Sequence, residues 1–185
     1  EDFKYKNPSI NLILIKNKFT KGLGRNYIDS SFIAKGKYFM LVNGDNVEPE
    51  ETLITILNEI GNSDMIIPHF GKNDKRGFCR VVLSKTFTLL INIVSGYNVP
   101  YYNGPVLHLR YNIMRWSPDT IGFAYQAELI TRILSEGKSF KSVEIKNEDR
   151  LKGESNAFTF QNILSVGHSL LQIFLRRLRI FLFYK

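Results

Sequence analysis

The chain has 185 residues, of which 44% are apolar and 23% charged, a balance that fits one globular domain and excludes a disordered chain. Lysine and arginine total 25 against 17 acids, so the formal charge of +8 predicts an anionic partner: nucleic acid, a phosphate-rich substrate or a membrane surface. The single cysteine, Cys79, excludes an internal disulfide framework and a cysteine zinc cluster, and it favours a reducing compartment.

Alternating strands and helices are predicted in the first part of the chain. Short apolar runs predict buried strands at residues 10–15, 38–42 and 65–68, and helices are predicted at residues 25–35 and after Pro49. This order is typical of an α/β protein with a parallel sheet covered by helices.

The second part continues the same pattern. It predicts a basic loop, a helix, a strand, an amphipathic helix and a strand, at residues 69–80, 81–94, 106–109, 123–135 and 142–145. No repeat or linker is visible. We therefore expect one domain over residues 1–157 and a helical extension over residues 158–185.

The extension is apolar, but Arg176, Arg177 and Arg179 interrupt it, so no run is long enough to cross a bilayer. A basic amphipathic helix of this kind is expected to lie in a membrane interface. Packing of the helix on the domain, or on a second copy of the chain, has similar weight.

A polar turn follows the predicted strand at residues 38–42. Ligands of open α/β sheets bind outside the carboxyl ends of the strands, so Asn43 and Asp45 are expected to project into that crevice. A carboxylate there can hold a divalent cation. The alternative is that Asp45 caps the next helix.

A glycine turn precedes the first predicted helix. Lys21, Gly22 and Gly24 would let a phosphate approach the backbone at the start of that helix. The spacing matches neither a dinucleotide fingerprint nor a P-loop, and an ordinary turn is the competing interpretation.

A first basic cluster surrounds the start of the apolar helix at residues 81–94. Arg76, Arg80, Ser84 and Lys85 could bind phosphate through guanidinium, ammonium and hydroxyl donors. A solvated basic loop is the alternative.

Another basic cluster lies in the polar loop before the last helix, where Arg150, Lys152 and Ser155 could approach one ligand or could form a surface turn. Glu128 is a candidate base or orienting group, with a solvated helical glutamate as the equal alternative. His108, inside a predicted strand, is expected to be a hydrogen-bonded core residue.

Taken in order, these segments resemble the family 2 glycosyltransferases, and among them the dolichol-phosphate mannosyltransferase-like and bacterial polyprenyl-phosphate enzymes. The matching stretches are KGLGRNYIDSSFIAKGKYFMLVNGD, the R-x-x-x-S of Arg80 to Ser84, GFAYQAELITRILSEGKSFKSVEI and EDRLKGESN. The R-x-x-G-x-S of Arg150 to Ser155 is the most specific element.

The resemblance implies a GT-A fold, a Rossmann-like, mostly parallel sheet flanked by helices, with a nucleotide-diphosphate sugar as donor. It places a Mg²⁺ or Mn²⁺ site at Asn43 and Asp45, Arg80 and Ser84 near the acceptor phosphate, and Arg150 near the donor diphosphate. The first βαβ unit of the family, which carries the base-reading residues, has no counterpart in the sequence.

Two positions of the metal motif depart from the family. Asn43 replaces the first acid of the D-x-D motif, and Val47 stands where many relatives have glutamine. Two oxygen ligands are thereby weakened or lost, although Asn43 can still offer its carbonyl.

The resemblance implies inverting transfer of a sugar to a polyprenyl phosphate at the cytoplasmic face of a membrane. An ionised phosphate acceptor needs no base, whereas a sugar hydroxyl would need one, with Glu128 or Asp119 as candidates. The alternatives are a family 2 enzyme that uses a saccharide acceptor in surface-glycan synthesis, or a non-catalytic membrane-peripheral homologue. Nucleic acid is not an expected partner, because it would explain the charge but not the ordered motifs.

Overall fold

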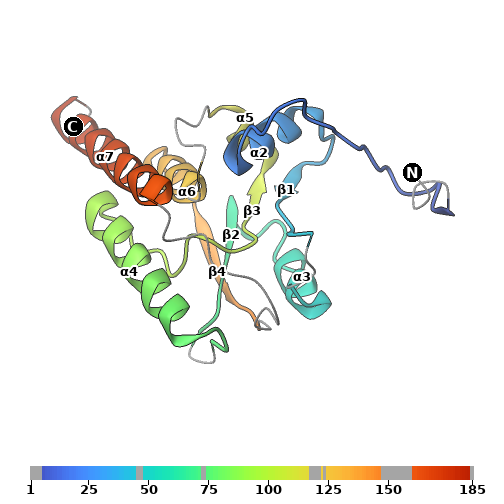
Figure 1. Ribbon diagram of the computed structural model, residues 1–185, viewed down its shortest axis with the longest axis horizontal. Helices are drawn as coiled ribbons and strands as arrows, with labels where there is room; N and C mark the ends of the chain where they lie inside the picture. The colour runs from blue at the N-terminus through green and yellow to red at the C-terminus, as the bar shows by residue number, and fades with distance from the viewer. Residues whose placement is uncertain are drawn as a thin grey trace.

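A mixed four-stranded sheet forms the centre of the protein in the computed structural model, which describes residues 6–44, 48–71, 74–116, 122, 124–146 and 160–183. The strands are β1 (Tyr38–Met40), β2 (Met65–His69), β3 (Leu107–Leu109) and β4 (Phe140–Glu144), in the spatial order β1-β3-β2-β4 (Figure 1). Both β1 and β2 pair antiparallel with β3, and β2 pairs parallel with β4. Three strands therefore run in one direction and β3 runs against them. The α/β class is confirmed, and the reversal of β3 is a feature that the sequence did not indicate.

Helices cover both faces of the sheet. Alternate residues of a strand point to opposite faces, and Met65 and Ile67 accordingly join the larger core while Ile66 joins the smaller one. The larger core lies under α2 (Leu23–Ile33) and α6 (Tyr125–Ser135), and the smaller core lies under α3 (Glu50–Leu57). Figure 1 shows α3 and α4 on opposite sides of the sheet.

Sequence signals explain where several helices begin and end. Helix α3 starts directly after Pro49 with two glutamates in its first turn, where the helix dipole favours acids. The short α5 (Arg110–Met114) follows β3 without a break. Helix α4 (Phe78–Ser95) ends at Gly96, whose φ of 76° is the left-handed conformation that glycine adopts without strain.

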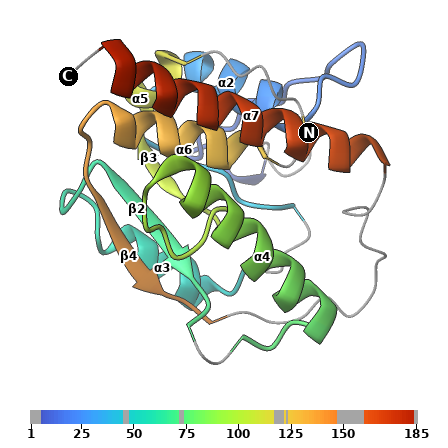
Figure 2. The ribbon, with the colours of Figure 1, turned by 90° about the vertical axis from the view of Figure 1, so that its left-hand side faces the viewer.

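The C-terminal helix α7 (Phe160–Phe183) packs beside α4 and α6 (Figure 2). Its inner side is anchored by Ser169 and Ile173, which are 0% and 2% exposed. Packing on the domain, one of the three arrangements expected for this helix, is observed. Among the described helices, α4 alone is long and apolar enough to cross a membrane by length and composition, and only 22% of it is buried.

One expected strand is absent from the described structure. Residues 11–17 form no strand, and the apolar side chains at residues 10–15 are exposed instead of buried. Their backbone hydrogen bonds are local, from Ile10 to Asn7 and from Leu12 to Ile10. The prediction was wrong because an apolar run becomes a strand only where another strand pairs with it, and no described strand pairs with this segment.

Candidate functional site

The loops that can bind a ligand meet at one edge of the sheet. Because β1, β2 and β4 run in the same direction, their carboxyl ends lie at the same edge, which is the usual ligand-binding side of an open α/β sheet. Asn43 follows β1, and Phe70 and Gly71 follow β2. Ile145 follows β4 and donates to the carbonyl of His69 at 2.9 Å.

A pocket of about 330 Å³ lies at this edge, between the loop after β2, one side of α4 and the segment that leads toward β3. We call it the edge pocket. It is lined by His69, Phe70, Gly71, Asp74, Arg76, Ser84, Lys85, Thr88, Leu89, Asn92, Asn98, Val99, Pro100 and Tyr101.

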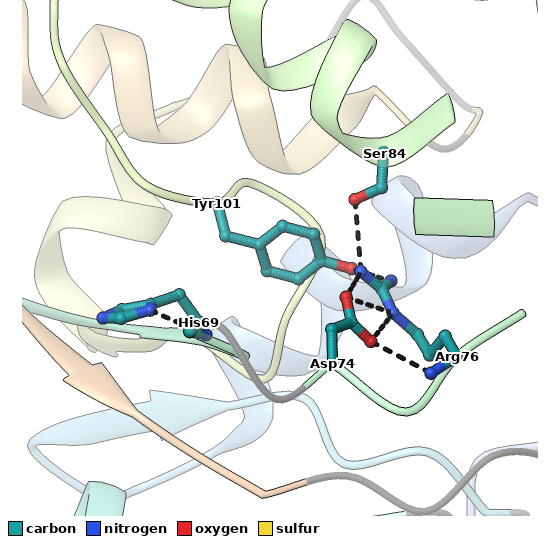
Figure 3. Close-up of polar contacts among 6 residues, drawn as sticks. His69, Asp74, Arg76, Ser84 and Tyr101 are labelled. Atoms are coloured by element: carbon teal, nitrogen blue, oxygen red, sulfur yellow. Dashed lines mark hydrogen bonds and ion pairs between the residues drawn. The ribbon is translucent and has the colours of Figure 1, made fainter. Parts of the chain in front are cut away.

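Arg76 is the most constrained cation of the edge pocket (Figure 3). Its guanidinium binds both carboxylate oxygens of Asp74, with a closest distance of 2.7 Å, and donates to the hydroxyl of Tyr101 at 2.9 Å. It also lies 4.4 Å from the ring centroid of Phe70, a cation–π distance. Burial alone would lower the pKa of Arg76, but the bonds to Asp74 and Tyr101 raise it overall. Arg76 therefore remains charged and is held in one orientation.

Asn92 fixes the opposite wall of the edge pocket. Its amide exchanges two hydrogen bonds with the backbone of Val99, at 3.0 and 3.1 Å, and accepts a third from the hydroxyl of Tyr102 at 2.8 Å. These bonds tie the segment before β3 to α4. These contacts hold the wall in place before any ligand binds. No sequence motif indicated them.

The predicted acceptor residues lie along α4. Ser84 lines the edge pocket, and its hydroxyl accepts from Arg76 at 3.5 Å, the outer limit of a hydrogen bond. Lys85 also lines it and makes no ion pair within the described chain. Arg80 is half-buried one helical turn before Ser84, on the same side of α4, and it is not a lining residue. The charge of Arg76 is balanced by its ion pair with Asp74, so the net positive charge of the edge pocket comes from Lys85.

The glycine turn is held on its own helix. Gly22 takes a φ of 80° at the start of α2, and Gly24 is buried in the first turn. Lys21 pairs with Asp29 of the same helix at 2.9 Å, and its hydrogen bond is the main reason that the pKa of Asp29 is lowered. None of these turn residues lines the edge pocket.

The end of β1 brings together two oxygen-bearing side chains. The Asn43 amide donates to the Glu48 carboxylate at 2.7 Å, and the other carboxylate oxygen, Oε2, is buried without a partner among the described residues. A buried carboxylate oxygen and an amide carbonyl suit a hard cation such as Mg²⁺ or Mn²⁺. The described residues contain no group of three acids, histidines or cysteines that could hold a metal. Asp45 lies outside the described residues, and sequence reasoning missed Glu48.

Glu128 faces α7 and not the edge pocket. It is 2% exposed, and its carboxylate lies 3.7 Å from the guanidinium of Arg176. The solvated glutamate that the sequence allowed is therefore excluded. Arg150, Lys152 and Ser155 lie outside the described residues.

His108 is a correction to the expected hydrogen-bonded core histidine. It is fully buried on β3, as expected, but neither ring nitrogen has a hydrogen-bond partner among the described residues. Burial lowers its pKa to about 3, so the imidazole is neutral.

Comparisons with known proteins support the fold. No model of a known protein family matches the sequence, and no curated protein matches it. Among solved structures, the chain is similar to glucosyl-3-phosphoglycerate synthase from Mycobacterium tuberculosis in complex with uridine diphosphate, with a TM-score of 0.55 and 11% identity. The match covers 90% of this chain and 59% of that one. That protein has a GT-A fold, so the expected fold class is confirmed.

Proposed function

We propose that this protein is an inverting glycosyltransferase that moves a sugar from a nucleotide-diphosphate sugar to a polyprenyl phosphate. The observation that carries the proposal is the edge pocket, where Ser84 and Lys85 of α4 face the loop after β2 at the ligand-binding edge of a GT-A sheet. Its positive surplus suits a phosphate acceptor. The family 2 assignment itself rests on the sequence motifs.

The proposed chemistry is a single in-line displacement. An oxygen of the ionised acceptor phosphate attacks the anomeric carbon of the sugar, the bond to the diphosphate breaks, and the nucleoside diphosphate leaves with the electron pair. No general base is needed. Arg80, Ser84 and Lys85 would position the acceptor phosphate, and Arg76 would hold the pocket wall.

The donor side of the proposed reaction rests on the sequence motifs. Arg150, Lys152 and Ser155 would bind the donor diphosphate, and Lys21, Gly22 and Gly24 would approach the nucleotide. Asn43, Asp45 and Glu48 would hold Mg²⁺ or Mn²⁺, which when bound neutralises charge on the leaving diphosphate.

Membrane association at the cytoplasmic face is part of the same proposal. Helices α4 and α7 pack side by side (Figure 2). Both helices carry large apolar side chains that are exposed, and we call these side chains together the α4–α7 apolar face. On α4 these include Phe78, Leu89 and Ile93, which are 81%, 58% and 62% exposed. On α7 they include Leu171, Phe181 and Phe183, which are 54%, 59% and 75% exposed. An apolar surface of this extent, on a chain of charge +8, suits an anionic bilayer.

The test supplies the full gene product with Mg²⁺ or Mn²⁺, polyprenyl phosphate and a panel of labelled UDP- and GDP-sugars. We expect label in the organic phase, at least ten-fold less label with Arg80→Ala, and none with Asp45→Ala. Arg115→Ala is the matched control, because Arg115 pairs with Glu136 and does not line the edge pocket.

Other outcomes would replace the proposal. Label on a water-soluble glycan would indicate a saccharide acceptor. That reaction needs a base, and Glu128 is buried against Arg176. No turnover with any donor would indicate a homologue that has lost catalysis.

A further inference from the structure

A second pocket lies at the C-terminal end of α4, beyond the part of that helix that lines the edge pocket. It has a volume of about 210 Å³ and is formed by the end of α4, by α6 and by the second half of α7, helices that Figure 2 shows side by side. The two pockets share no lining residue. We call this one the helix pocket.

Two consecutive arginines bring positive charge to the helix pocket. Arg177 donates through Nη1 to the carbonyls of Ile93 and Val94, in the last turn of α4, at 2.9 and 3.3 Å. Arg176 lies 3.7 Å from the carboxylate of Glu128 and donates to the Glu128 carbonyl at 3.3 Å. The two positive charges face one carboxylate and the end of a helix, which is equivalent to about −0.5 charge. The balance is positive.

Hydrogen-bond donors converge on the same space. The Arg177 contacts described above use Nη1 alone, and a guanidinium has five N–H donors. Tyr97 also lines the pocket. Burial raises the pKa of its hydroxyl, while the charges of Arg176 and Arg177 act in the opposite direction, so the hydroxyl lies within the field of both. The hydroxyl-bearing Ser95, Thr131 and Ser135 complete the polar lining, and Ile173 and Ile180 form an apolar wall.

We propose that the helix pocket binds a phosphate group through Arg177, Arg176 and Tyr97. Guanidinium groups bind phosphate oxygens through paired, charge-assisted hydrogen bonds, and the pocket is large enough for a phosphate with its water. The phosphate can belong to a soluble ion or to a lipid headgroup, because α4 and α7 also carry the α4–α7 apolar face. This inference does not depend on glycosyl transfer.

The first arm of the test titrates inorganic phosphate into the full chain and measures its affinity by calorimetry and the arginine Nε–Hε signals by NMR. Tyr97→Phe removes one hydroxyl while keeping the ring, and should weaken binding about five-fold. Arg177→Gln should weaken it ten-fold or more. Arg179→Gln, an exposed arginine of the same helix that does not line the pocket, is the matched control and should change the affinity less than two-fold.

A second arm measures co-flotation with phosphatidylglycerol vesicles. If Tyr97→Phe weakens both phosphate and vesicle binding while Arg179→Gln weakens neither, the headgroup is the source. If Tyr97→Phe weakens phosphate binding alone, the ligand is soluble.

The proposal is overturned if phosphate leaves the wild-type signals unchanged, or if Arg179→Gln and Arg177→Gln reduce the affinity equally. Circular dichroism checks the fold of each variant. Should Arg177→Gln unfold, Tyr97→Phe still decides the matter. None of these residues lines the edge pocket, so this result and the transferase result are independent.

Discussion

At the residue scale, His108 shows how a buried polar group can weaken a fold. Its ring lies edge-on to Tyr27 with a centroid distance of 6.4 Å, and both nitrogens lack hydrogen-bond partners among the described residues. Such a group loses its water on folding and gains no hydrogen bond in return. The imidazole is neutral because burial of its charged form would cost still more free energy.

We predict that His108 makes stability fall with acid. Its pKa is about 3 in the folded protein against 6.5 when unfolded, so between these values the unfolded chain binds an extra proton. The free energy of unfolding should therefore fall by up to about 1.4 kcal/mol for each pH unit as pH drops below 6.5. Urea unfolding between pH 7 and 4 measures this slope.

His108→Leu should remove that component of the slope and raise stability at neutral pH by about 1–3 kcal/mol. His168→Gln, at an exposed histidine of α7, is the control for the loss of a histidine as such. An unaltered slope in His108→Leu would contradict the assignment.

Single substitutions also test the metal site that we propose at the end of β1. Glu48→Gln removes the carboxylate whose Oε2 has no partner among the described residues, and should weaken Mn²⁺ binding ten-fold or more, as measured by electron paramagnetic resonance. Adding Asn43→Asp to that variant returns a carboxylate to the neighbouring position and should recover most of the affinity. Glu51→Gln, an exposed acid of α3, is the control. Equal affinity in the wild type and Glu48→Gln would remove Glu48 from the site.

At the element scale, α7 packs against the C-terminal end of α4 at Gly96. A Cβ atom on Gly96 would lie 2.7 Å from Cζ of Arg177, so the absence of a side chain lets the guanidinium approach the last turn of α4. Arg177 therefore contacts the last turn of α4, and Arg176 beside it contacts Glu128 of α6. The basic face that the sequence suggested for α7 is used in part to attach the helix to the domain.

Two glycine variants separate backbone strain from this contact. Gly96 and Gly137 have φ values of 76° and 77°, but a Cβ on Gly137 would meet nothing within 4 Å. Gly137→Ala should cost about 1–2 kcal/mol from the left-handed backbone alone. Gly96→Ala should cost more, because Arg177 must also move, and urea unfolding measures the difference. Equal losses in the two variants would show that the Arg177 contact contributes nothing to stability.

At the scale of the whole molecule, the two helices that carry the α4–α7 apolar face lie on one side of the protein (Figure 1). A monomer in water rarely keeps such a surface uncovered. Either the bilayer proposed here or a second copy of the chain could cover this face, and an experiment can distinguish the two.

We predict that the protein binds phosphatidylglycerol vesicles and that Phe181→Ser weakens binding ten-fold or more, since burying a phenylalanine contributes about 1.5–3 kcal/mol. Phe32→Ser is the matched control, because Phe32 is 57% exposed on α2, outside the α4–α7 apolar face, and Phe181 is 59% exposed. Co-flotation measures both. Concentration-dependent dimers by sedimentation, with no vesicle binding, would assign the face to a second copy.

Local patterns predicted most of the elements but not all of their partners. The predicted strands and helices from residue 23 onward are found within a few residues, because helical and strand periodicity are properties of neighbouring residues. Residues 10–15 carry the same apolar signal without forming a strand, since pairing depends on a distant segment. The predicted helix already placed Ser84 on α4. The contacts of Arg76 with Asp74 and Tyr101 depend instead on how the loop after β2 packs against the segment before β3.

The sequence by itself determined the α/β class and, from residue 23 onward, most of the order of the elements, because both follow from the spacing of apolar residues, glycines and acids along the chain. Only the tertiary structure decided that β3 runs against its neighbours, that Glu128 and Arg176 face each other, that Glu48 meets Asn43, and that α7 packs on α4. Most of these contacts bring together groups that are tens of residues apart in the sequence. Their energies depend on which surfaces are buried together, which the spacing along the chain does not specify.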